Sequence, residues 1–235
     1  MDKKQLLAFI DNKSLYREVG KVIDVAKKSA KDSENDLFKN VIDPFSAIFD
    51  SLCQGIGLNE WLKGEKSRQV QKTLQNALGE FHQEIIGSIM GWKSMGKGHV
   101  FDVMNEDKKI IAEVKNKYNT TKGNHKTAIY DDLKGQIKNK YGDFTAYYVE
   151  IIPRKREMYN KIFTPPDNRT GKRRPKNEKI RVIDGKSFYA MASGDADALK
   201  KIYLVLPAII GEILGKSVSD FTKEKLFSEL FDKAY

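Results

Sequence analysis

A change in hydrophobic periodicity near residue 90 constrains the fold of this chain more than any other feature. Before it, apolar residues recur at three- and four-residue spacing, as at Leu74, Leu78 and Phe81, which is the pattern of amphipathic helices. After it, short runs of β-branched and aromatic residues alternate with turn-forming residues, which favours strands. The sequence therefore predicts an α/β (α+β) fold, a central mixed β-sheet flanked by helices.

The same patterns predict the individual elements. We expect helices over 5–30, from Asp43-Pro44 onward, over 57–90 and over 127–141, strands over 99–104, 109–115, 144–152 and 180–183, and helices from there to the C-terminus. Residues 153–179 have the composition of a loop, with four prolines. No repeat or linker divides the chain, so we expect a single domain over 1–235, mainly helical at 1–90 and 182–235.

The sharpest local feature is Asp102 followed, after ten intervening residues, by Glu113-Val114-Lys115. In a strand, residues i and i+2 point to the same face, so Glu113 and Lys115 would project together while Ala112 and Val114 pack on the core. Asp102 would lie on the neighbouring strand of a hairpin, where cross-strand partners approach within about 5 Å. Two carboxylates at that spacing repel each other unless a cation lies between them.

Magnesium is the cation that best suits such a pair, because it prefers carboxylate oxygens, water and phosphate oxygens as ligands. Asp102 and Glu113 would then be metal ligands, with Lys115 stabilising charge on a scissile phosphate. Glu80 and Glu84, one turn apart on the preceding helix, offer a further carboxylate. The alternative is an ordinary strand edge with a solvated glutamate and lysine.

Positive charge is the second feature, since the formal net charge is +10. Residues 153–181 hold eleven Lys or Arg against three acids, and such a cluster favours a polyanionic partner. Arg169, Arg173 and Arg174 could each donate two hydrogen bonds to guanine in the major groove, with Lys172 beside them and Asn168 and Asn177 as further base contacts. The alternative is a flexible basic segment that contacts phosphates alone.

A polar segment follows the Glu-x-Lys strand. Its residues suit a loop that holds backbone phosphates near the cleavage point, and the candidates are Lys117, Asn119, Lys122, His125 and Lys126. His125 could instead act as a general base, although a lone histidine more often has a structural or phosphate-contacting role.

Cysteine usage and hydropathy indicate the compartment. The single cysteine, Cys53, excludes an intramolecular disulfide framework and a cysteine-rich zinc site. No apolar run approaches the roughly 20 residues that span a bilayer. We therefore expect a cytoplasmic protein with no membrane partner.

Beyond these patterns, the chain resembles a known family. Phe101-Asp102 with Glu113-Val114-Lys115 resembles the PD-(D/E)XK nuclease signature, with phenylalanine in place of the usual proline. Longer blocks are similar to the small type II restriction endonucleases that cut GGNCC or GGWCC sites, and these blocks are residues 39–45, 71–77, 79–83 and 170–175.

The resemblance implies a site-specific deoxyribonuclease of a restriction-modification system, with a catalytic core over 99–152 and a DNA-recognition loop over 153–181. It implies a homodimer on palindromic double-stranded DNA, one active site per strand, and a cognate DNA methyltransferase that protects the host. Carried over by motif, Asp102 and Glu113 are metal ligands, Lys115 is the catalytic lysine and Glu80 is an accessory acid. A structure-selective resolvase or repair nuclease and a non-catalytic DNA-binding module remain the alternatives.

Overall fold

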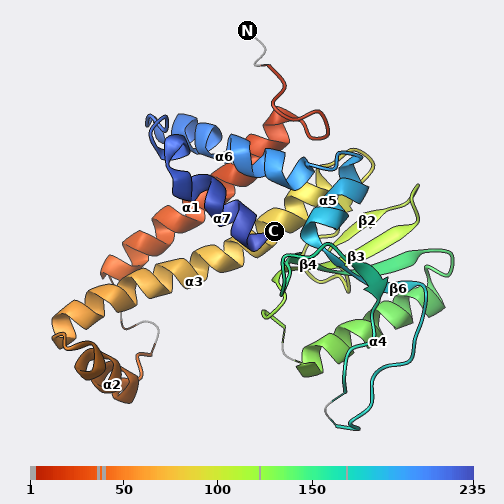
Figure 1. Ribbon diagram of the computed structural model, residues 1–235, viewed down its shortest axis with the longest axis horizontal. Helices are drawn as coiled ribbons and strands as arrows, with labels where there is room; N and C mark the ends of the chain where they lie inside the picture. The colour runs from red at the N-terminus through yellow and green to blue at the C-terminus, as the bar shows by residue number, and fades with distance from the viewer. Residues whose placement is uncertain (1–3, 36–37, 39–40, 122, 168) are drawn as a thin grey trace. The chain divides into compact units, whose positions relative to one another are not determined.

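The computed structural model describes residues 4–35, 38, 41–121, 123–167 and 169–235 (Figure 1). The elements are α1 (Asn12–Asn35), α2 (Pro44–Gln54), α3 (Leu58–Gly87), β1 (Lys93–Ser94), β2 (Val103–Asn105), β3 (Ile110–Lys117), α4 (Gly123–Asn139), β4 (Thr145–Ile152), β5 (Asn160–Ile162), β6 (Ile180–Asp184), α5 (Gly185–Ser193), α6 (Ala198–Leu214), the 3₁₀ turn η2 (Phe221–Lys223) and α7 (Lys225–Ala234). Contacts divide the chain into two compact units, a helical unit (residues 20–78) and a sheet unit (residues 1–19 and 79–235). The single domain expected over 1–235 stays a prediction.

The helical unit contains α2 and parts of α1 and α3. Asp43 begins α2 as expected: its side chain accepts hydrogen bonds from the amides of Phe45 and Ser46, and Pro44 occupies the first turn, where a missing amide hydrogen costs nothing. The indole of Trp61 in α3 donates to Asp50 in α2 at 2.9 Å. An apolar row on α2 stays exposed, and it consists of Phe45, Ile48, Phe49 and Leu52.

The sheet unit is built on a six-stranded mixed sheet in the order β1-β2-β3-β4-β6-β5. The central strands β3, β4 and β6 are parallel, and the outer pairs are antiparallel. Parallel strands need crossover connections, which α4 supplies between β3 and β4. The mixed sheet expected from the sequence is therefore confirmed.

Helices cover both faces of the sheet, with α4 on one side and α5 on the other (Figure 1). On the α4 face, Ile111 and Tyr148 pack with Tyr130 and Leu133 in one apolar cluster. On the opposite face α5 packs closely on β4, because a side chain at Gly185 would collide with the backbone of Ile151. Burial on both faces explains why the strands read as near-continuous apolar runs.

Several predicted boundaries were wrong. The first helix starts at Asn12, since residues 7–10 form a turn closed by a Leu7↔Ile10 bridge. The strand expected over 99–104 is confined to Val103–Asn105, and Asp102 precedes it. The stretch expected as a loop over 153–179 contains β5, which pairs with β6 through residues far along the chain. Local composition could not reveal that pairing.

None of the helices within the described ranges is long and apolar enough to span a membrane.

Candidate active site

The β2–β3 hairpin brings the predicted carboxylates to one point. Val103 of β2 pairs with Ala112 of β3. The contact between the two strands extends to the preceding residue, because the amide of Asp102 donates to the carbonyl of Ala112 at 3.0 Å. Continuing that antiparallel register places Asp102 opposite Glu113 on the same face. Ala112 and Val114 lie buried on the other face, as the alternation predicted.

Hydrogen bonds hold the three charged side chains in place. The amide of Val114 donates to Oδ2 of Asp102 at 2.7 Å, and Nζ of Lys115 donates to Oε1 of Glu113 at 2.5 Å. The side chains of Glu113 and Lys115 are 15% and 31% exposed. The cluster is therefore sheltered and still open to a substrate.

Burial raises the pKa values of the Asp102 and Glu113 carboxyl groups. Desolvation raises the pKa of Asp102, against the lowering effect of the Val114 amide and the Lys115 charge. Desolvation and then the neighbouring Asp102 charge raise the pKa of Glu113 to about 7, although Lys115 acts in the opposite direction. The ionised pair is thus costly by itself, and an added positive charge would stabilise it.

The preceding helix α3 presents a different residue to the cluster from the one expected. Nε2 of Gln83 lies 3.5 Å from the carbonyl oxygen of Val114, at the limit of hydrogen bonding. Glu84 instead accepts from Ser94 at 2.7 Å, and the exposed Glu80 pairs with Lys97 at 3.4 Å. Among the residues that the structure describes, no group of three or more His, Cys, Asp or Glu is placed to hold a metal ion.

The neighbouring strand β4 carries a carboxylate that sequence reasoning missed. Glu150 pairs in register with Lys115, is 7% exposed, and accepts from Lys126 and from the hydroxyl of Tyr159, both at 2.5 Å. A single acid inside the otherwise apolar and aromatic run 145–152 was the available signal, because a buried charge in a strand needs partners.

The residues proposed to contact DNA are placed as follows. Lys117 lies half-buried at the end of β3, Asn119 and His125 are exposed, and Lys126 is committed to Glu150. Lys122 and Asn168 lie outside the described residues. The polar segment after β3 thus borders the cluster on the side of β4, because the amide of Tyr118 donates to the carbonyl of Ile152 at 3.0 Å.

The arginines within residues 153–181 differ in whether they are exposed or bound to carboxylates. Arg169 and Arg173 are exposed, as is Lys172. Arg174 is held by two carboxylates: it donates twice to Asp131 of α4, at 3.0 and 2.7 Å, and once to Asp167, at 2.8 Å. Arg174 therefore anchors the loop to α4 in this structure.

A mixed sheet between helices, with an aspartate, a glutamate and a lysine gathered at one point of a β-hairpin, fits an α+β nuclease core. The family model described as Eco47II restriction endonuclease matches residues 7–215. The chain belongs to this restriction endonuclease family, and its function is site-specific cleavage of DNA.

Two relatives support this assignment over nearly the whole chain. The type II restriction enzyme Eco47II of Escherichia coli is 40% identical over 98% of this chain and 99% of its own length. The type II restriction enzyme Sau96I of Staphylococcus aureus is 32% identical over 97% of this chain and 89% of its own length. The resemblance noted from short sequence blocks is therefore confirmed.

Proposed function

We propose that this enzyme is a magnesium-dependent endonuclease whose reaction is carried out at Asp102, Glu113 and Lys115. The observation that carries the proposal is the pair of sheltered carboxylates, Asp102 and Glu113, facing each other across the hairpin with Lys115 beside them.

The donor set fits a magnesium ion. Asp102 and Glu113 supply hard oxygen ligands, and Mg²⁺ in phosphoryl-transfer sites is usually held by one or two carboxylates, with water and phosphate oxygens completing the shell. Repulsion between the two carboxyls, which contributes to the raised pKa of Glu113, would be relieved by a divalent cation. When bound, the metal would lower the pKa of a water and neutralise charge on the phosphate. The role of Glu80 as an accessory metal ligand stays a prediction. In this structure its carboxylate pairs with Lys97.

The chain's own residues then serve the hydrolysis. Lys115 is held next to Glu113 with a side chain about one-third exposed, so its ammonium can donate to a non-bridging oxygen of the scissile phosphate. Its charge would be most effective in the transition state, where negative charge grows on those oxygens. Water adds to phosphorus, the bond from phosphorus to O3′ breaks, and O3′ takes up a proton. The products carry 3′-hydroxyl and 5′-phosphate ends.

We propose that sequence recognition lies in the basic loop. Arg169 and Lys172 are exposed near its tip, where a guanidinium can bond O6 and N7 of guanine. A GGNCC-like target is the proposed site, because it contains two guanines on each strand and follows the similarity to the restriction enzyme family. Arg174 holds this loop in place through ion pairs with Asp131 of α4 and Asp167 of the loop itself.

A palindromic target implies two active sites, one per strand, while each chain supplies one Asp–Glu–Lys cluster. We therefore propose a homodimer on double-stranded DNA. An enzyme that cuts such short sites would also cut its host's DNA, so a cognate DNA methyltransferase is the expected genetic partner.

Digestion of unmethylated phage DNA tests the proposal. Purified protein is incubated with magnesium, or with EDTA in a parallel tube. Discrete fragments that require magnesium support a site-specific enzyme, and mapping their ends gives the target. A smear would instead indicate a structure-selective repair nuclease, and intact DNA with a salt-sensitive gel shift would indicate a binding module. Either outcome would overturn the proposal.

A further inference from the structure

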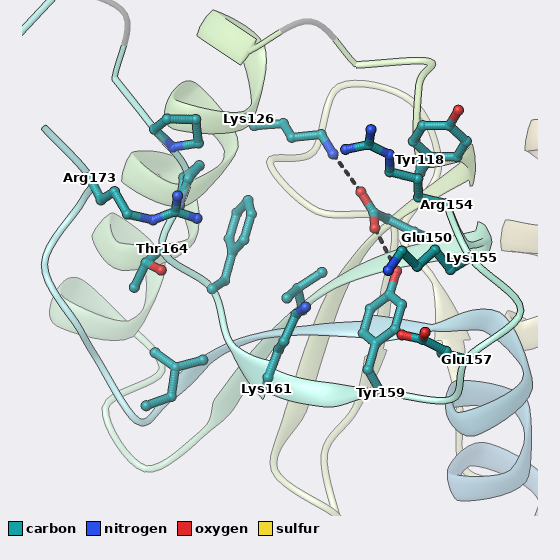
Figure 2. Close-up of a pocket in the computed structure, with 15 residues that line it drawn as sticks. Tyr118, Lys126, Glu150, Arg154, Lys155, Glu157, Tyr159, Lys161, Thr164 and Arg173 are labelled. Carbon is teal, nitrogen blue, oxygen red and sulfur yellow. Dashed lines mark hydrogen bonds and ion pairs between the residues drawn. The ribbon is translucent and has the colours of Figure 1, made fainter. Parts of the chain in front are cut away.

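A pocket of about 670 Å³ lies one strand further along the sheet from the active-site cluster. Glu150 lines it, and Glu150 is the register partner of Lys115, so both side chains point to the same face of the sheet. Figure 2 shows this pocket with its polar side chains. None of Asp102, Glu113 and Lys115 lines it, and so it is a site beside the reacting group.

The carboxylate charge of Glu150 in the pocket is compensated by its hydrogen-bond partners. Glu150 lies between Lys126 and Tyr159 in Figure 2, and each of its two oxygens accepts one hydrogen bond. Lys126 also lies over the ring of Tyr148, 5.4 Å from its centroid. The Lys126 charge is thus committed to the protein, and Glu150 does not leave a free anion to repel a negatively charged ligand.

The rim is different, because it carries cations without acidic partners. Arg154, Lys155, Lys161 and Arg173 are exposed and line the pocket, and none of them forms a salt bridge within the described part of the chain. Lys161 only lies over the ring of Tyr159, at 5.0 Å.

Nearby cations outside the pocket are engaged instead. Arg174 pairs with Asp131 and Asp167, and Arg156 donates to the carbonyl of Asp232. One rim carboxylate, Glu157, opposes the free cations. Four exposed cations of this basic segment therefore surround one cavity, while the exposed Arg169 and Lys172 lie outside its lining.

The rim cations are spread across the opening. In Figure 2, Arg173 stands on one side of the pocket and Arg154 and Lys155 stand on the other. Cations on opposite sides of one opening suit a ligand with several linked phosphates better than a single small anion. Neighbouring strands of a sheet lie about 4.8 Å apart. The pocket thus begins one strand spacing away from the strand that carries Lys115.

We propose that this pocket binds the phosphate backbone of the cleaved DNA strand next to the scissile phosphate, through Arg154, Lys155, Lys161 and Arg173. The inference rests on the proposed function and assigns these residues to positioning of the strand, independent of base sequence. Each phosphate that a cation neutralises releases condensed counterions, so the contacts contribute a salt-dependent part of the affinity.

The test uses Arg154→Gln and Lys161→Gln, singly and together, with Arg173→Gln as an independent variant on the opposite side. Dissociation constants are measured without metal over a range of salt concentrations, for an unbroken duplex carrying the mapped target and for an unrelated duplex. Lys216→Gln is the matched control, because Lys216 is an exposed cation that does not line the pocket. Melting temperatures check that each variant is folded.

Each substitution in the pocket is expected to lower the slope of log affinity against log salt by about one, equally for both duplexes, and Lys216→Gln to leave it unchanged. An unchanged slope in the double variant would overturn the inference, as would a loss confined to the target duplex. Digestion by the unaltered enzyme tests the proposed function separately, so the two failures are distinguishable.

Discussion

The backbone amide of Val114 donates a hydrogen bond of 2.7 Å to the carboxylate of Asp102, across the β2–β3 hairpin. Val114 is the residue between Glu113 and Lys115, so this one contact fixes Asp102 relative to both of its neighbours in the site. It also occupies a lone pair of an acid whose pKa is raised by burial. The hairpin therefore imposes the geometry of the proposed catalytic group.

Asp102→Asn should abolish cleavage while leaving the fold intact, because an amide oxygen can still accept from the Val114 amide but no longer carries charge. We expect at least about a hundredfold loss of cleavage rate, of the size seen when a charge-stabilising group is removed. Lys115→Ala should have the same effect on rate. Gel shifts in the presence of EDTA should show that binding to the target largely survives. Retained cleavage in either variant would remove these residues from the active site.

The metal-free enzyme should lose stability as pH rises from about 4.5 toward 7. Glu113 titrates near 7 in the folded protein and at its ordinary value of 4.5 when unfolded, so the native state binds more protons in this window and a rise in pH favours unfolding. Thermal unfolding across this range should show a smaller loss for Glu113→Gln, which has no proton to release. If wild type and variant lose stability in parallel, the pKa of Glu113 is not raised as described.

Magnesium should change this pH dependence. Because the ion binds the ionised carboxylates, its stabilising effect on the wild-type protein should increase with pH over the same window. The measurement is the melting temperature with and without magnesium at several pH values. Glu113→Gln serves as the control and should respond less to the ion.

Arg169→Ala and Arg174→Ala should have different consequences. Arg169 is exposed, and its loss should reduce discrimination between target and altered sites by about 1–3 kcal/mol if it reads guanine. Arg174 is bound to Asp131 and Asp167, so its loss should lower the melting temperature as well. A double-mutant cycle with Asp131→Ala should show that the two effects on stability are not additive. Purely additive effects would contradict the anchoring role.

Glu150→Gln should destabilise the sheet unit by roughly 2–4 kcal/mol, since removing one member of a sheltered ion pair leaves the other without compensation. The amide can still accept from Tyr159, but Lys126 loses its partner. Urea unfolding measures the change. The double variant Glu150→Gln with Lys126→Met should recover part of the loss, and no recovery would mean that the pair is not the cause.

Local patterns were sufficient to predict much of this protein. The alternation of Ala112, Glu113 and Val114 predicted which side chains would be buried, since a strand repeats every two residues. Asp43-Pro44 predicted the start of α2, because capping is decided within one turn. The short family blocks predicted a restriction endonuclease, and the match over residues 7–215 confirmed it.

Only the tertiary structure decided which charged groups are free to act. Glu150 and Lys126 are 24 residues apart, and Arg174 and Asp131 are 43 apart, so no local spacing could show that they pair. The same holds for Gln83 of α3, which lies 31 residues before its partner Val114 of β3. Charge composition counts every arginine equally, whereas folding commits some to carboxylates and leaves others exposed around a pocket. The physical reason is that ion pairing depends on distances between elements that are far apart in the sequence, and folding alone sets those distances.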